Sequence, residues 1–138
     1  MSDHVTPLSL SSAIRLGAMA VPPVHGPVFK RSQGGICGAC AIGAPIFALF
    51  GESAREELDS RGSSLTTIRQ IFTEHWPWTV TRVTHPVRGS DSELVNAMVS
   101  LFETYFWTRE RIADWIETLE AQQDTQAQPL PDLQEATR

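Results

Sequence analysis

The stretch Thr108-Arg-Glu-Arg-Ile-Ala-Asp-Trp-Ile-Glu-Thr-Leu119 carries the clearest structural pattern of the chain. Ile112, Trp115, Ile116 and Leu119 stand at i, i+3, i+4 and i+7, which places all four on one face of a helix. Thr108 precedes this pattern, and its hydroxyl can accept a hydrogen bond from an amide of the first turn. The sequence therefore predicts a helix that starts after Thr108 and buries its apolar face.

Similar patterns upstream predict further helices. Hydroxyl caps and helical spacing indicate a first helix from Ser9 to about Ala20, ended by Pro22-Pro23. We expect a second helix from about Cys40 to Phe50, a third over 64–75, and one that opens with Asp91 or Ser92 as its cap. Residues 52–63 fit either a helical turn or a surface loop.

The connections are expected to be loops. Residues 21–35 are rich in proline and glycine, and residues 79–84 form the one strand-like stretch, for which no partner strand is predicted. We therefore predict an all-α fold, a small single domain of four to five short helices with Pro/Gly-rich loops. The expected boundaries are a flexible lead-in at 1–8, a helical domain at 9–122 and a disordered tail at 123–138.

Small residues on the first two helices predict how these helices pack. We expect that these residues let the two helices cross closely; they are Ala13, Gly17, Ala41, Gly43 and Ala44.

Composition narrows the class of partner. The chain has 138 residues, enough for one domain, and 41% of them are hydrophobic. Sixteen acidic against 11 basic residues give a net charge of −5, which argues against nucleic acid, because phosphate binding needs a clustered positive field. The two cysteines cannot build a disulfide framework, and residues 1–10 lack a signal-peptide pattern, so we expect a cytoplasmic protein.

An uncharged apolar segment at 36–50 raises the question of a membrane. As a helix, its 15 residues would reach about 22 Å, which is shorter than the ~30 Å hydrocarbon core of a bilayer. The segment also contains Gly38, Gly43 and Pro45. We therefore expect core packing rather than a membrane span.

Cys37-Gly-Ala-Cys40 is the one motif that could carry chemistry. A helix start would favour a thiolate, so the pair could cycle a disulfide. It could also supply half of a zinc site, with His75 and His85 as the remaining ligands. The third interpretation, which we favour, is packing, because free cysteine is among the most buried residue types.

Aromatic and acidic residues offer candidate binding surfaces. The tryptophans Trp76, Trp78 and Trp107 would form core if buried and a binding patch if exposed. Glu110 and Asp114, with other charges of the last helix that include Arg109, suggest a solvated face or a docking face for a basic partner.

Three motifs resemble, in order, those of a group of small bacterial proteins of no established function. They are Ala13-Ile-Arg-Leu-Gly-Ala18, Cys40-Ala-Ile-Gly-Ala44 and Trp107-Thr-Arg-Glu-Arg-Ile-Ala-Asp-Trp115. The group often has a polar Leu-Asn-Asp stretch where this chain has Leu101-Phe102-Glu103, and Cys37 lies outside its pattern. The resemblance implies an architecture and no activity.

No nucleophile motif, cofactor loop or complete ligand set is visible in the sequence. We therefore expect a non-enzymatic interaction or accessory protein that binds a protein partner or a second copy of itself. The alternative is a small zinc-binding or thiol-redox protein that uses Cys37 and Cys40.

Overall fold

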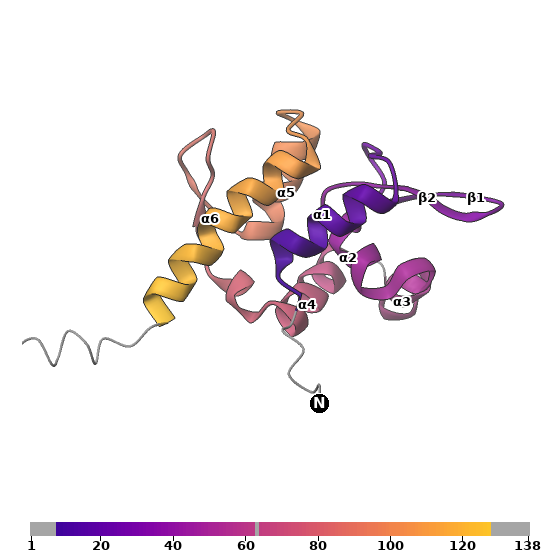
Figure 1. The fold of residues 1–138 in the computed structure, drawn as a ribbon, viewed down its shortest axis with the longest axis horizontal. Helices are drawn as coiled ribbons and strands as arrows, with labels where there is room; N and C mark the ends of the chain where they lie inside the picture. The colour runs from indigo at the N-terminus through magenta and orange to yellow at the C-terminus, as the bar shows by residue number, and fades with distance from the viewer. Residues whose placement is uncertain (1–7, 63, 128–138) are drawn as a thin grey trace, which may run out of the picture.

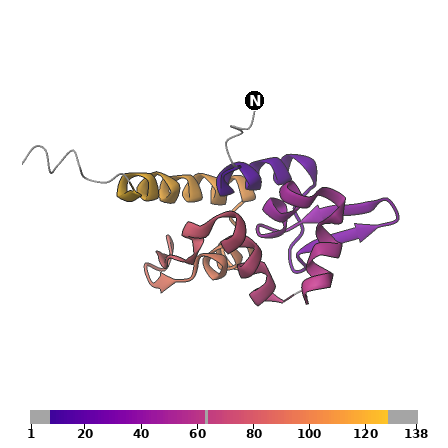
Figure 2. The same cartoon turned by 90° about the horizontal axis from the view of Figure 1, so that it is seen from below.

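A computed structural model describes residues 8–62 and 64–127 of the chain. Over these residues it contains six α-helices: α1 Leu10–Ala20, α2 Gly43–Phe50, α3 Ala54–Arg61, α4 Leu65–His75, α5 Leu94–Glu103 and α6 Arg109–Ala127. Two short 3-10 helices, η2 Gly51–Ser53 and η3 Pro77–Val80, join them. Figure 2 shows α1 and α6 on the upper side of the molecule, with the other helices below.

The helices start where side-chain hydroxyls can cap them. Ser9 Oγ accepts a hydrogen bond from Ser12 N at 3.1 Å, and Ser64 Oγ accepts one from Thr67 N at 3.2 Å. Thr108 Oγ1 does the same for Arg111 N at 3.0 Å, as its position before α6 predicted. Helix α6 continues to Ala127, past the expected end at 122, and residues 1–7 and 128–138 lie outside the described part of the chain.

The fold is mostly helical, but the prediction of a purely all-α domain is wrong. Two antiparallel two-stranded sheets are present in the described residues: β1 Phe29–Ser32 with β2 Gly35–Ala39, and β3 Val83–Thr84 with β4 Asp91–Ser92. In the first sheet, β1 lies in the expected loop 21–35, and β2 begins at the last residue of that loop, Gly35, which takes a φ of 117° after the turn. The second gives Val83–Thr84 the partner that the sequence did not reveal (Figure 1).

The second sheet also changes the start of α5. Asp91 and Ser92 pair in β4 instead of capping the helix, and Glu93 takes the cap position with a β-region backbone. Helix α2 begins at Gly43 rather than near Cys40, so that Pro45 falls in the first turn, where no intrahelical amide partner is lost.

Helices α1 and α2 cross in very close contact, as their small residues predicted. A Cβ atom added to Gly17 would lie 2.0 Å from the carbonyl oxygen of Ala44. A Cβ on Gly43 would lie 2.4 Å from the carbonyl oxygen of Val28. Both contacts are with backbone, so only glycine fits at these two positions.

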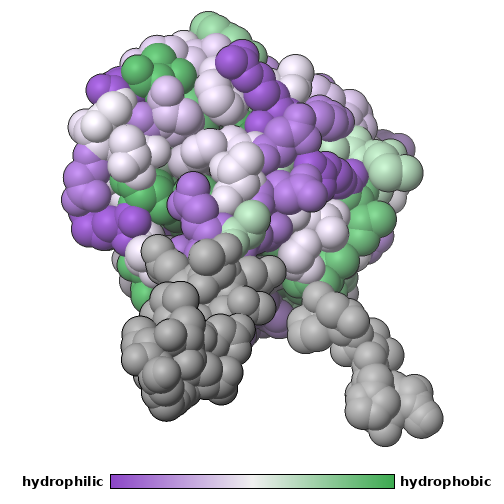
Figure 3. Space-filling view, turned by 60° about the vertical axis from the view of Figure 1, so that its left-hand side comes forward, coloured by the Kyte–Doolittle hydropathy of each residue, from purple (hydrophilic) through white to green (hydrophobic). Residues whose placement is uncertain are grey.

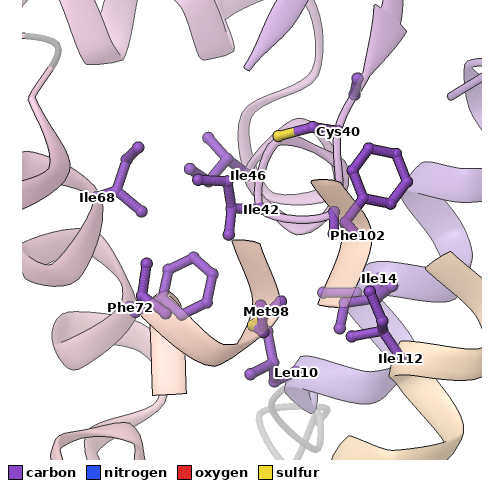
Figure 4. Packing of buried hydrophobic residues seen from close by; sticks show 14 of the residues in the cluster. Leu10, Ile14, Cys40, Ile42, Ile46, Ile68, Phe72, Met98, Phe102 and Ile112 are labelled. Atoms are coloured by element: carbon purple, nitrogen blue, oxygen red, sulfur yellow. The ribbon is translucent and has the colours of Figure 1, made fainter. Parts of the chain in front are cut away.

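The helices share one hydrophobic core. Figure 4 shows side chains of different helices converging, among them Leu10 and Ile14 from α1, Phe72 from α4, Met98 from α5 and Ile112 from α6. On the face shown in Figure 3, hydrophilic side chains predominate and hydrophobic ones form small separate areas. None of the helices described here combines the length and the apolar character that a membrane span requires.

Candidate functional site

The predicted metal ligands are not brought together. Among residues 8–62 and 64–127, which include all four predicted ligands, no group of three or more His, Cys, Asp or Glu side chains could hold a metal ion. Cys37 lies half-buried on β2, and Cys40 follows that strand with 6% of its surface exposed. His75 is exposed at the end of α4, with its ring against Phe50 and Trp76.

The environment of Cys40 opposes thiolate chemistry. The amides of Gly43 and Ile42 at the start of α2 point to its sulfur and favour the thiolate, as a helix start does. Burial acts in the other direction and is the larger effect, so the pKa of Cys40 is raised. The thiol therefore stays protonated and behaves as a buried apolar group.

Both ring nitrogens of His85 form hydrogen bonds within the fold. Its ring is completely buried, Nδ1 accepts hydrogen bonds from Val87 N at 3.2 Å and Arg88 N at 3.1 Å, and Nε2 lies 3.0 Å from Ser100 Oγ. Because Nδ1 acts as an acceptor, the proton is on Nε2, which donates to Ser100. Burial, and then the charge of Arg88, lower the pKa of His85. The neutral ring therefore joins the β3–β4 hairpin to α5 through hydrogen bonds.

The three tryptophans, for which the sequence left core and binding patch open, differ in their burial. Trp76 is only 4% exposed, and its indole Nε1 donates a hydrogen bond to the carbonyl of Leu8 at 2.8 Å. Trp78 and Trp107 are half-buried, and the guanidinium of Arg111 lies 3.9 Å from the centre of the Trp107 ring. Trp76 therefore belongs to the core, because its large apolar ring finds a partner for its one polar atom there.

The acidic residues of α6 mostly bind α1 rather than face solvent freely. Arg15 Nη2 donates to Asp114 Oδ1 and to Glu117 Oε1, both at 2.7 Å. Glu120 accepts from Ser11 N at 2.9 Å and from Ser11 Oγ at 2.6 Å, at the start of α1. The two predicted acidic docking residues are both exposed, and Asp114 is also paired with Arg15.

Arg109 is a structural residue that sequence reasoning placed on a solvated face. It is 3% exposed, and its guanidinium donates to the carbonyls of Ala39 at 3.2 Å and Ala18 at 3.3 Å. These carbonyls stand at the end of β2 and near the end of α1, so Arg109 joins three elements. Burial lowers its pKa. The signal for this role was weak, since the residue stands at the first position of a helix with exposed charged neighbours.

The described residues line a cavity of about 250 Å³, partly open to solvent, between the end of β2, the first half of α4 and the end of α5. Its walls are mainly apolar, formed by Val28, Ile42, Leu65, Ile68, Val99 and Phe102. Cys40 also lines it, and in Figure 4 the sulfur points to the side on which Ile68 lies. Among the described lining residues, Glu103 is the one that carries a charge.

Glu103 is half-buried at the last position of α5. Its Oε2 accepts a hydrogen bond from Gly26 N at 2.9 Å. Within the described part of the chain, Oε1 has no hydrogen-bond partner and the carboxylate makes no salt bridge. The last carbonyls of a helix add partial negative charge at the same place. The part of the cavity beside Glu103 is therefore suited to a hydrogen-bond donor or a cation.

Aromatic rings continue the cavity wall to the surface. The imidazole of His25 stacks on Phe102 with ring centroids 4.1 Å apart and planes at 8°, and Phe106 follows at 5.8 Å from His25. Phe106 is 73% exposed and takes a φ of 57°. We call His25, Phe102 and Phe106 the aromatic ridge.

The unusual backbone of Phe106 has a structural cause. After α5 the chain turns so that Trp107 N donates to the carbonyl of Leu101 at 2.9 Å, which helps to end the helix. Such a turn needs a left-handed residue, and the segment 104–108 contains neither glycine nor asparagine. A helix break without these residues is the one sequence signal that could have pointed to Phe106.

No protein-family model, curated protein or solved structure matches the chain.

Proposed function

We propose that this protein is a non-enzymatic interaction protein of the bacterial cytoplasm, and that it binds a protein partner through the aromatic ridge and the cavity beside it. The observation that carries the proposal is Phe106, a 73% exposed aromatic residue that is linked to the apolar cavity through the rings of His25 and Phe102. Covering a phenylalanine side chain is worth about 1.5–3 kcal/mol, and aromatic residues beside pockets dominate the energetics of interfaces.

The state of the polar groups supports binding rather than catalysis. The Cys40 thiol has a raised pKa, and both ring nitrogens of His85 are used within the fold. Two free thiols suit a reducing compartment. The acidic residues that could have formed a second docking face are largely held by Arg15 and Ser11.

The test uses site-specific photo-crosslinking in the cells that make the protein. A benzophenone amino acid replaces Phe106 in one strain and Val80, which is 67% exposed on η3, in the control strain. We expect a discrete crosslinked species from position 106 and none from position 80. The same products from both positions, or no product from position 106, would refute the proposal.

A substitution extends this test without disturbing the turn. Phe106→Asn removes the ring, and asparagine tolerates the left-handed backbone that this position requires. We expect an unchanged melting temperature and loss of the partner in co-purification. Phe106→Trp, which keeps an aromatic ring, should retain the partner.

Metal and thiol assays separate this proposal from a zinc or redox protein. We expect no stoichiometric zinc in the purified protein, and we expect Cys37 to react with a thiol reagent well before the buried Cys40. One equivalent of zinc, or a disulfide between the two cysteines that cycles with a reductant, would support the alternative.

A further inference from the structure

We infer that the cavity binds a lysine side chain of the partner, with its four-carbon stem between the apolar walls and its ammonium on Glu103. This inference rests on the proposed function, since it names what the partner inserts beside the aromatic ridge.

The cavity has a mainly apolar lining with one charged side chain, Glu103, among the described residues. Val99, Phe102 and Glu103 stand at i, i+3 and i+4 on α5, so one face of the helix presents two apolar side chains and one carboxylate. Leu65 and Ile68 on α4 line it as well. A volume of about 250 Å³ holds a single long side chain and not a larger ligand, because sites for drug-sized molecules span roughly 300–1,000 Å³.

The negative charge of Glu103 in the cavity wall favours a cationic ligand. Glu103 has no positive partner among the described residues, and it stands at the C-terminal end of a helix, where the partial charges of the carbonyls are negative. A neutral apolar side chain would pack against the walls but would give this carboxylate no positively charged partner. A long side chain with an apolar stem and a cationic end satisfies both parts of the site.

The apolar walls favour lysine over arginine. Oε2 of Glu103 accepts from Gly26 N at 2.9 Å, and the carboxylate keeps further acceptor positions for a ligand. Lysine has an apolar stem of four methylene groups and arginine has one of three, so lysine covers more of the apolar wall. Its ammonium group is a compact point charge that a single carboxylate can bind.

The test is an NMR titration of the ¹⁵N-labelled full chain with blocked amino acids, each carrying an N-acetyl and a C-methylamide group. We expect blocked lysine to shift the amide signals of Gly26, Phe102 and Glu103, and to bind about fivefold more tightly than blocked norleucine, which has the same stem without the charge. Blocked arginine should bind more weakly than lysine. Equal binding of lysine and norleucine, tighter binding of arginine, or shifts confined to other regions would overturn the inference.

Two variants test the roles of charge and volume. Glu103→Gln keeps an oxygen that can accept from Gly26 N, so we expect the fold to persist and the preference for lysine over norleucine to vanish. Glu110→Gln makes the same change in net charge at an exposed position of α6 and should leave the preference intact. Val99→Phe should abolish binding of both probes, because its ring occupies the cavity.

The outcome separates this inference from the proposed function. If Glu103→Gln still crosslinks its partner through position 106 and the probes show no preference for lysine, the lysine site is wrong and the interaction surface stands. If blocked lysine binds but position 106 yields no crosslink in cells, the cavity recognises lysine and the partner proposal fails. An absence of shifts at the solubility limit of blocked lysine refutes the inference directly.

Discussion

The α1–α2 crossing and the cavity beside α4 and α5 are lined by similar apolar residues but packed in opposite ways. At the crossing, the backbone of α1 at Gly17 is so close to Ala44 that no side chain fits between them. At the cavity, the side chains of α4 and α5 leave about 250 Å³ that is partly open to solvent. The first region is a backbone contact that leaves no room for change, and the second is a space that, in our proposal, receives a side chain of the partner.

The largest expected effect comes from adding one methyl group at the crossing. Gly17→Ala gains up to about 1 kcal/mol of helix propensity, but its Cβ would lie 2.0 Å from the Ala44 oxygen, and that backbone atom cannot move alone. We expect a net loss of about 3 kcal/mol in the free energy of unfolding, measured by urea denaturation.

Gly34→Ala is the matched control for this change. Gly34 lies in the β1–β2 turn with nothing within 4 Å of an added Cβ. We expect a change within about 0.5 kcal/mol. Similar losses for both variants would show that the α1–α2 contact is not the critical one.

The second prediction concerns the arginine that links the crossing to α6. Arg109→Met keeps the apolar stem but leaves the carbonyls of Ala18 and Ala39 without their side-chain donors, and we expect a loss of about 2 kcal/mol. Arg111→Met, which removes only the exposed contact with Trp107, should cost less than about 1 kcal/mol. If Arg109→Met is as stable as the unmodified protein, the desolvation cost of the buried charge offsets the free energy that its hydrogen bonds contribute.

The third prediction is a dependence of stability on pH through His85. Burial lowers its pKa in the folded state below the usual value of about 6.5, so the unfolded chain takes up the proton first as the pH falls. Stability is therefore complete above about pH 6.5 and declines below it, by at most about 1.4 kcal/mol per pH unit, until the pH reaches the folded-state pKa.

Urea denaturation between pH 7.5 and 5.0 measures this slope. His85→Asn, whose amide oxygen can accept from Val87 and Arg88, should flatten the profile. The hypothesis fails if the profile of His85→Asn keeps the slope of the unmodified protein.

The features predicted correctly from sequence are local. Ser9, Ser64 and Thr108 mark the starts of three helices because a cap acts within one turn. The close approach at Gly17 could also be predicted, because a small residue on the apolar face of a helix lets another backbone come near. The two sheets were missed because β4 has only two residues and because the pairing of β1 with β2 depends on a turn rather than on strand patterns.

The candidate site could not be derived from the sequence for a related reason. The cavity arises where four segments meet, and Val28, Ile42, Ile68 and Val99 are ordinary core residues when taken one by one. Glu103 stood out only as a departure from the pattern that the resemblance suggested. Burial likewise depends on neighbours from other elements, which is why the sequence left Trp76 open between core and surface and placed Arg109 on a solvated face.

The smallest expected effect has the opposite sign to the others. Val99→Leu adds one methylene beside the open volume, and we expect it to raise the free energy of unfolding by about 0.5–0.8 kcal/mol. Val21→Leu adds the same group at a buried position after α1 and should lower stability by about 1 kcal/mol, because a packed core has no space for it. If both variants lose stability, the cavity closes in solution and the contrast between the two regions disappears; a gain in Val99→Leu with weaker lysine binding would show that the open volume serves the ligand.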